Sequence, residues 1–241
     1  MKGIILAGGT GSRMLPMTEA TNKHLLPVGG KPMIYHPIEK LTGVGINEIL
    51  IVTGMEHMGN MISTLGSGKN FGCEFTYKVQ DEAGGIAQAL GLARNFVNED
   101  SMCVLLGDNI FTDTLENAVS GFKNQDGCEA MIILKEVEDP QRYGVALLDE
   151  NNEQIVLIEE KPSAPKSNLA VTGIYFYDSS VFDVVKTLKP SARGELEITD
   201  INNYYVQKGT MDHYVMDGIW TDAGTHESYW LANRLMMDLA K

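Results

Sequence analysis

The feature that most constrains the fold of this chain is a regular alternation of short apolar runs with segments of helical periodicity. Four runs in the first half predict buried strands: Lys2–Ala7, Glu48–Thr53, Cys73–Val79 and Met102–Leu106. Helical patterns cover residues 32–41 and 86–97, the second with apolar residues on one face. Strand and helix in alternation predict a parallel sheet covered by helices on both faces.

The second half of the chain is richer in predicted strands. Four segments have the extended pattern: Ala130–Leu134, Gly144–Leu148, Gln154–Ile158 and Ala170–Tyr177. Helical patterns cover residues 181–188, 198–207 and 226–239, and Asp113 with Glu116 resembles a capping box that opens a further helix. Because no repeat or linker interrupts the 241 residues, one domain over residues 1–241 is expected.

Composition and charge exclude several classes of protein. Hydrophobic residues make up 44% of the chain, which is enough for a sizeable core. The formal net charge of −13 disfavours binding to nucleic acid or to an anionic membrane. No apolar run approaches the length of a membrane helix, and no signal peptide is recognisable. Cys73, Cys103 and Cys128 have no metal-ligand spacing, so free thiols in the cytoplasm are expected.

A glycine-rich loop follows the first predicted strand, in the segment Leu6-Ala7-Gly8-Gly9-Thr10-Gly11-Ser12-Arg13. Glycines let backbone N–H groups approach a phosphate closely. Met14 stands where a dinucleotide-binding loop would have its third glycine, and no P-loop pattern is present. Arg13 and Lys23 could clamp a triphosphate, although a glycine turn with two solvated cations would explain the spacing equally well.

Motifs along nearly the whole chain resemble those of the sugar-phosphate nucleotidyltransferases, in particular the short form of the glucose-1-phosphate thymidylyltransferase branch. The segments that carry the resemblance are Gly8–Thr18, Lys23–Pro27, Gly85–Ala89, Leu106–Asn109, Arg142–Val145, Glu159–Pro162, Val171–Tyr175, Arg193–Asp200 and Trp220–Thr225. The resemblance implies a Rossmann-like α/β fold with a mixed, mostly parallel sheet flanked by helices. It also implies a nucleotide-binding part over about residues 1–110 and a sugar-binding part over about residues 111–241.

The resemblance implies that a thymidylyl group passes from dTTP to glucose 1-phosphate, giving dTDP-glucose and pyrophosphate. Arg13, Lys23 and Lys161 are the implied catalytic residues: Arg13 for the transition state, Lys23 for the α-phosphate and Lys161 for the attacking sugar phosphate. The implied nucleotide-binding residues are Leu6, Gly8, Gly9, Gly11, Ser12, Arg13, Gln80 and Gly85. An amide such as that of Gln80 matches the imide edge of thymine or uracil, since it both donates and accepts.

Two aspartates are the expected metal ligands. Asp108 follows a predicted buried strand and Asp222 lies beside glycine in a turn, where their oxygens suit Mg²⁺. A helix cap for Asp108 and an Asx turn for Asp222 are the alternative roles, although Asp113 is the better cap candidate. The resemblance assigns both aspartates to Mg²⁺, which would neutralise charge that develops at the α-phosphorus.

The sugar-phosphate side is expected to use carboxylate, ammonium and backbone groups. The implied residues are Asp108, Tyr143, Gly144, Glu160, Lys161, Val171 and Arg193. Glu160 would accept hydrogen bonds from sugar hydroxyls and Lys161 would contact the phosphate, although a surface ion pair would also explain their adjacency.

Some questions stay open at this level. A uridylyltransferase or other sugar-nucleotide pyrophosphorylase is the alternative enzyme, because Gln80 cannot distinguish dTTP from UTP. A catalytically silent nucleotide-sugar sensor is the alternative of another class. The chain departs from the family pattern at Gly84, where Asp is frequent, and at Ala223, where Thr is usual. A homo-oligomer is expected from the resemblance, with no nucleic-acid or membrane partner.

Overall fold

The structure is a computed structural model that describes residues 1–239. It contains two compact units, and neither is a continuous stretch of chain. The unit that we call the β1 unit comprises Lys2–Ala83, Leu105–Thr114 and the segment from Gly218 to the end of the described chain. The unit that we call the β11 unit comprises Met1, Gly84–Val104 and Leu115–Asp217.

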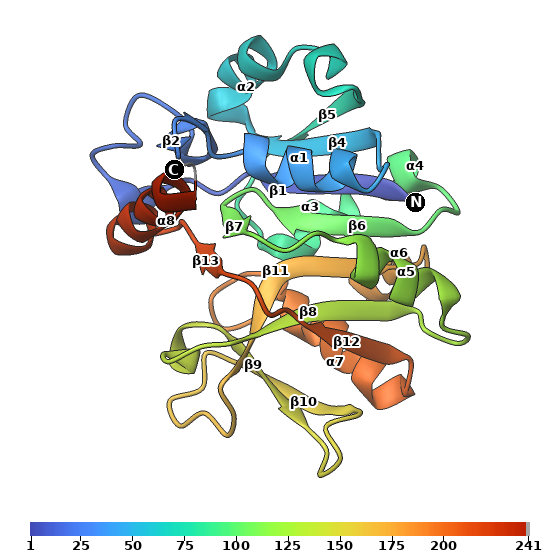
Figure 1. The fold of residues 1–241 in the computed structure, drawn as a ribbon. Helices are drawn as coiled ribbons and strands as arrows, with labels where there is room; N and C mark the ends of the chain where they lie inside the picture. The colour runs from blue at the N-terminus through green and yellow to red at the C-terminus, as the bar shows by residue number, and fades with distance from the viewer. Residues whose placement is uncertain (240–241) are drawn as a thin grey trace. The chain divides into compact units, whose positions relative to one another are not determined.

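The β1 unit is built on three parallel strands. Its strands are β1 (Lys2–Ala7), β4 (Glu48–Gly54), β5 (Glu74–Gln80), β2 (Pro27–Val28), β3 (Lys31–Pro32), β7 (Asn109–Phe111) and β13 (Trp220–Asp222). Its helices are α1 (Tyr35–Gly43), α2 (Met58–Leu65), α8 (His226–Leu239) and the 3₁₀ turns η1 (Ser12–Met14), η2 (Lys23–Leu25), η3 (Met55–His57) and η4 (Lys69–Phe71). In Figure 1, α1 lies in front of β1 and β4, and α2 lies beside β5.

The parallel ladder brings the glycine-rich loop next to two other strand ends. β1 pairs with β4 from Gly3↔Ile49 to Ala7↔Thr53, and β4 pairs with β5 up to Gly54↔Gln80. The apolar side chains of β1 and β4 are almost completely buried, as expected for strands covered on both faces. The loop after β1 and the ends of β4 and β5 therefore lie at the same carboxyl edge, where open α/β sheets bind ligands.

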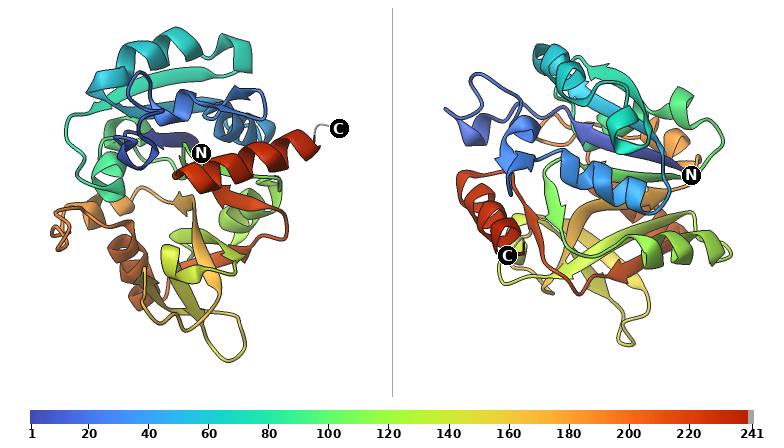
Figure 2. Two further views of the ribbon diagram at one scale, coloured as in Figure 1. Left: turned by 90° about the vertical axis from the view of Figure 1, so that its left-hand side faces the viewer. Right: turned by 45° about the horizontal axis from the view of Figure 1, so that its top comes forward.

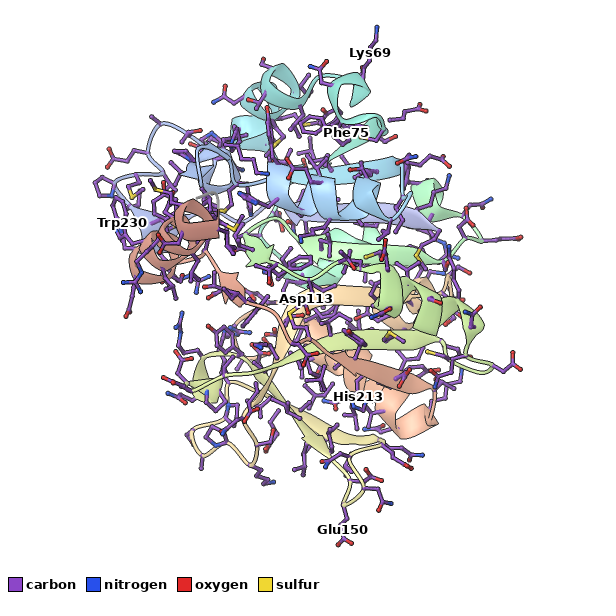
Figure 3. The ribbon with its side chains drawn as sticks, viewed as in Figure 1. Lys69, Phe75, Asp113, Glu150, His213 and Trp230 are labelled. Atoms are coloured by element: carbon purple, nitrogen blue, oxygen red, sulfur yellow. The ribbon has the colours of Figure 1, made fainter. Side chains whose placement is uncertain are left out.

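The C-terminal part of the β1 unit is carried by β13 and α8. β13 pairs with β7 in an antiparallel ladder. Helix α8 packs against β2. The hydroxyl of its buried Tyr229 donates a hydrogen bond to the Pro27 carbonyl of β2. The two views in Figure 2 show β13 leading directly into α8, which is drawn in red. Trp230 lies on the outer side of α8 in Figure 3 and is 63% exposed.

The β11 unit is a mixed sheet with its own helices. Its strands are β8 (Ala130–Glu136), β9 (Gly144–Leu148), β10 (Ile155–Glu160), β11 (Leu169–Tyr177) and β12 (Met211–Val215). Its helices are α3 (Ile86–Gly91), α4 (Arg94–Val97), α5 (Glu116–Asn124), α6 (Val181–Val185), α7 (Ile198–Lys208) and the turn η5 (Pro140–Arg142). β11 pairs antiparallel with β8 and β9, and β12 pairs parallel with β8. Strand β6 (Met102–Leu106) begins in this unit and ends in the β1 unit.

The predicted α/β class, with a mixed and mostly parallel sheet flanked by helices, is confirmed. The single helix expected over 86–97 is instead two short helices, α3 and α4. The capping-box prediction is wrong: Leu115 caps α5, and the Asp113 carboxylate accepts a hydrogen bond from the Gly218 amide. The expectation of one domain divided near residue 110 stays a prediction. Over residues 1–239, the structure contains no helix that is long and apolar enough to cross a bilayer.

Candidate active site

The glycine-rich loop leaves β1 through a left-handed turn. Gly11 has a φ of 70°, and a Cβ atom there would lie 2.9 Å from the Thr18 Cγ2 atom. The Gly11 carbonyl accepts hydrogen bonds from the Met14 amide and the Thr18 hydroxyl, each at 2.8 Å. The buried Met14 anchors the turn, which leaves Ser12 and Arg13 exposed to solvent.

A cavity of about 330 Å³ lies beside this loop, within the β1 unit. Its wall is formed by the loop after β1, Asn22, the ends of β4 and β5 and the residues that follow them; the lining residues are Gly8, Gly9, Thr10, Asn22, Gly54, Met55, Glu56, His57, Gln80, Asp81 and Ala83. None of these is Lys or Arg, and Glu56 and Asp81 are acidic, so the cavity suits a neutral group better than a triphosphate.

Gln80 lies at the end of β5 with 9% of its surface exposed. Its Oε1 atom lies 2.4 Å from the position that a Cβ atom of residue 8 would occupy. A side chain at Gly8 would therefore displace the Gln80 amide. The structure thus brings Gly8 and Gln80 together in the cavity, and their contact with a base stays a prediction.

Lys23 and Asp108 form a buried ion pair. Lys23 lies in η2, and its Nζ atom is 2.5 Å from Asp108 Oδ2, with side chains only 10% and 11% exposed. The Asn109 side-chain amide donates to the other carboxylate oxygen at 3.1 Å. Burial alone would raise the pKa of Asp108, but the attraction of Lys23 and these hydrogen bonds lower it below its ordinary value. Asp108 therefore stays ionised at neutral pH.

The side chain of Asn22 holds the turn that carries Lys23. Its amide donates to the Ala7 carbonyl at 3.2 Å, and its oxygen accepts from the backbone amide and the Nδ1 atom of His24. His24 is buried. Burial and, next, the positive charge of Lys23 lower the pKa of His24 to about 3, so its ring is neutral.

Asp222 is brought beside Asp108 by the β7–β13 ladder. Asp222 is paired with Asn109, and the Ala223 amide donates to the Asp108 carbonyl at 2.8 Å. The Trp220 indole donates to the Asn109 side-chain oxygen at 2.7 Å, which fixes the same ladder from its other end. Asp222 therefore ends a short strand, whereas the sequence placed it in a turn.

Three charged side chains, those of Asp108, Asp222 and Arg13, come close to one another beside Gly224. The position of a Cβ atom on Gly224 would lie 3.3 Å from Asp108 Oδ2, 3.5 Å from Asp222 Oδ2 and 3.4 Å from Arg13 Nη2. The two carboxylate oxygens thus lie within about 7 Å of one another. No cluster of three or more His, Cys, Asp or Glu side chains suited to a metal occurs in the described chain. Two aspartates fit Mg²⁺, which commonly takes one or two carboxylates together with substrate phosphates.

Six of the seven predicted sugar-phosphate residues lie in the β11 unit, whereas Asp108 belongs to the β1 unit, where it pairs with Lys23. Glu160 ends β10 opposite Gly144 of β9, and a Cβ atom on Gly144 would lie 3.5 Å from the Glu160 carboxylate and 3.6 Å from Val171. Lys161 has a φ of 45°, an uncommon conformation for a residue with a side chain, and its amide donates to the Tyr143 carbonyl. Glu160, Gly144, Val171, Lys161 and Tyr143 are thus held together by strand pairing.

Charged partners hold Glu160 in place. Its carboxylate accepts a hydrogen bond from the Thr199 hydroxyl at 2.8 Å and lies 3.4 Å from both the Lys161 ammonium and the Arg193 guanidinium. Arg193 also pairs with Glu197, four residues further along the chain, at 2.8 Å. The surface ion-pair alternative for Glu160 and Lys161 matches this arrangement, and contact with a sugar phosphate stays a prediction.

Gly85 is the one predicted base-side residue that belongs to the β11 unit. Its φ is 97°, and a Cβ atom there would lie 2.5 Å from the Leu196 carbonyl of the same unit. The preceding residue, Gly84, stands where the family frequently has Asp, and its amide donates to the Gln88 side chain at 3.1 Å. An Asp at position 84 would meet that side chain within 2.6 Å of its Cβ atom. Gln88 therefore occupies the space that the family's usual Asp would take.

Several residues of these clusters were not predicted. They are Asn22, Asn109, Thr199, Glu197 and Gly224. The family motifs were the available signal for four of them, because these motifs contain Asn109, Thr199, Glu197 and Gly224. Asn22 carried only the general preference of Asn for the position before a helical turn.

Comparison with known proteins identifies relatives whose similarity covers nearly the whole chain. The family model for nucleotidyl transferase matches residues 2–238. A glucose-1-phosphate thymidylyltransferase of Neisseria meningitidis serogroup A is 44% identical over 235 residues, which are 95% of this chain and 80% of that protein. The low-salt glycan biosynthesis nucleotidyltransferase Agl11 of Haloferax volcanii is 41% identical over 239 residues, which are 99% of this chain and 66% of that protein.

Solved structures resemble the chain closely as well. A crystal structure from Bacillus anthracis, described as a candidate glucose-1-phosphate thymidylyltransferase in complex with a sucrose, is 59% identical. It has a TM-score of 0.94 and covers 99% of this chain and 96% of its own. A UDP-glucose pyrophosphorylase complexed with UDP-glucose is 26% identical with a TM-score of 0.86, covering 99% of this chain and 98% of its own. By sequence and by structure, this chain belongs to the nucleotidyl transferase family.

Proposed function

We propose that this protein is a glucose-1-phosphate thymidylyltransferase, which converts dTTP and glucose 1-phosphate into dTDP-glucose and pyrophosphate. Relatives that carry this name are 40–45% identical over 94–95% of the chain, which supports this substrate pair. The structural observation that carries the proposal is the convergence of Arg13, Asp108 and Asp222 around one point beside Gly224. A cation and two carboxylates at such short range suit a triphosphate bound with a divalent metal ion.

The reaction is an in-line displacement at the α-phosphorus. An oxygen of the sugar 1-phosphate forms the new bond, the bond from the α-phosphorus to the bridging oxygen of the β-phosphate breaks, and pyrophosphate leaves with its charge. Because the attacking group is already an anion, no covalent enzyme intermediate is required. Positioning and charge stabilisation then account for catalysis.

Arg13 and Lys23 hold the phosphates in this proposal. The exposed Arg13 guanidinium contacts the leaving pyrophosphate and stabilises charge in the transition state. Lys23 binds the α-phosphate, which requires its ammonium to exchange its Asp108 partner for a phosphate oxygen. Mg²⁺ held by Asp108 and Asp222 would supply further neutralisation of the phosphate charge.

The base and sugar groups are recognised by neutral and acidic residues. The cavity beside Gly8 and Gln80 contains no cation and so suits the base, whose imide edge the Gln80 amide can pair with. In the β11 unit, Glu160 accepts hydrogen bonds from sugar hydroxyls, and Lys161 and Arg193 bind the sugar phosphate. Each of these proposed contacts uses a side chain that already belongs to the cavity beside Gly8 or to the cluster around Glu160.

Two competing functions make different predictions. A uridylyltransferase is favoured by the structural similarity to UDP-glucose pyrophosphorylase, at 26% identity. A silent sensor would not need the charged cluster around Gly224. We further propose that the protein works in the cytoplasm as a homo-oligomer.

Pyrophosphate release tests the proposal directly. The purified protein is incubated with glucose 1-phosphate, Mg²⁺ and either dTTP or UTP, with a reaction lacking the sugar phosphate as control. We expect release that depends on the sugar phosphate and is faster with dTTP. Faster release with UTP would establish the uridylyltransferase instead, and no release with either nucleotide would refute both activities.

A further inference from the structure

Gly224 lies between the metal-site strand β13 and helix α8, and it is buried. Unlike Gly11, it has no φ in the left-handed region, so its backbone conformation is open to residues with side chains. A turn requirement therefore does not explain glycine at this position. The space around its Cα atom provides another reason.

The three nearest neighbours of that space are ends of charged side chains. The three heavy atoms nearest to a Cβ atom on Gly224 would be Asp108 Oδ2, Arg13 Nη2 and Asp222 Oδ2, at 3.3, 3.4 and 3.5 Å. A methyl group at this point would stand among two carboxylates and a guanidinium, where it could neither donate nor accept a hydrogen bond.

Asp108 has little freedom to move away from such a methyl group. Its Oδ2 atom is held by the Lys23 ammonium at 2.5 Å, and its Oδ1 atom accepts from the Asn109 amide at 3.1 Å. A contact at 3.3 Å is tight for a Cβ atom, so Asp108 would have to shift by a few tenths of an ångström. Mg²⁺ demands near-ideal octahedral geometry, so small shifts of a ligand weaken its binding.

We propose that Gly224 is a positioning residue that keeps open the space between Asp108 and Asp222 for a divalent cation and its phosphate or water ligands. The inference rests on the proposed function, since it assigns a role to the metal site of that reaction. Any side chain at position 224 would fill part of this space and would weaken metal binding without changing the fold.

Gly59 offers a matched control. It is the second residue of helix α2, its φ is not left-handed, and nothing lies within 4 Å of the position of its Cβ atom. Gly59→Ala and Gly224→Ala therefore make the same chemical change in the same unit. Only the second change places the new methyl group beside the aspartates.

Mn²⁺ binding provides the test, followed by electron paramagnetic resonance of free Mn²⁺ in the presence of dTTP. We expect Gly224→Ala to weaken Mn²⁺ binding about tenfold or more, within the range found when residues supporting a metal site are changed. Gly59→Ala is expected to bind as the wild type does, and circular dichroism is expected to be unchanged for both variants. Equal Mn²⁺ affinity for Gly224→Ala and wild type would overturn the role of Gly224 while leaving the proposed reaction intact.

A second measurement needs no variant. Mn²⁺ in the wild-type protein is expected to broaden the amide resonance of Gly224 at low Mn²⁺ occupancy, and to leave that of Gly59 sharp. A sharp Gly224 resonance in the presence of bound Mn²⁺ would overturn the inference. If the wild type with dTTP bound no Mn²⁺, the metal site of the proposed function would fail, and this inference with it.

Discussion

Replacing Lys23 by methionine tests the buried ion pair most directly. Methionine retains much of the length of the side chain but leaves Asp108 without the partner that lies 2.5 Å away. Both side chains are about nine-tenths buried, so water cannot readily replace the lost charge. Breaking a buried pair on one side typically costs about 3–5 kcal/mol of unfolding free energy, and we expect Lys23→Met to fall in this range.

Urea denaturation at pH 7, followed by circular dichroism, measures this cost. Lys31→Met is the control, because Lys31 pairs with Glu39 on the surface, where side chains are 34% and 49% exposed. That change is expected to cost about 1 kcal/mol or less. The double variant Lys23→Met/Asp108→Asn removes the unpaired charge and should recover part of the lost stability.

Divalent cations add a second expectation with a clear sign. Without Lys23, a cation can approach Asp108 with no competing ammonium, so Mg²⁺ should stabilise Lys23→Met more than it stabilises the wild type. A loss in Lys23→Met no larger than that in Lys31→Met would show that the Lys23–Asp108 pair is not the buried, stabilising interaction described above. No recovery in the double variant would show that an unpaired Asp108 is not the cause of the loss.

Three further predictions concern single side chains. Because the pKa of His24 falls from 6.5 to about 3 on folding, the unfolded chain binds the extra proton between these values. His24 should therefore make wild-type stability decrease as the pH falls below 6.5, by up to about 1.4 kcal/mol per pH unit, and urea melts of His24→Gln should show a weaker dependence, because burial also lowers the pKa of His36 and of His213. Arg13→Ala should lower kcat about 10²–10³-fold. The free energy of unfolding from urea melts should change by only about 0.5 kcal/mol, because Arg13 is exposed. Near-normal turnover would exclude the role of Arg13 in the transition state. Thr199→Val removes the 2.8 Å hydrogen bond to Glu160. In steady-state kinetics, the KM for glucose 1-phosphate should rise while the KM for dTTP is unchanged. Equal changes in both KM values would contradict a sugar-side role for Thr199.

Local sequence patterns predicted most of the longer elements correctly. The strands Lys2–Ala7 and Gly144–Leu148 and the helix His226–Leu239 have the bounds that periodicity indicated. These segments have strong and regular apolar patterns, and their neighbours bury the faces that the patterns define. The motif resemblance also identified the family, which the match over residues 2–238 confirms.

Other elements could not be predicted because their stability comes from pairing rather than from local pattern. Strand β13 has only three residues, and its extended conformation depends on hydrogen bonding to β7. The capping box at Asp113 had the right spacing, but the Gly218 amide, which is 105 residues away, competes for the carboxylate. Long-range partners such as these leave no trace in a window of ten residues.

The sequence alone determined which side chains are available and where the β1 strand stops, because Gly8 and Gly9 interrupt the apolar run directly after Ala7. It therefore placed Arg13, Lys23, Asp108 and Asp222 in motifs that suit phosphate and metal chemistry. Only the tertiary structure decided that Lys23 is paired with Asp108 in a buried site, and that Asp222 and Arg13 reach the same point beside Gly224. Distances between residues as far apart as 13 and 224 are set by strand pairing and core packing, which depend on the whole chain at once.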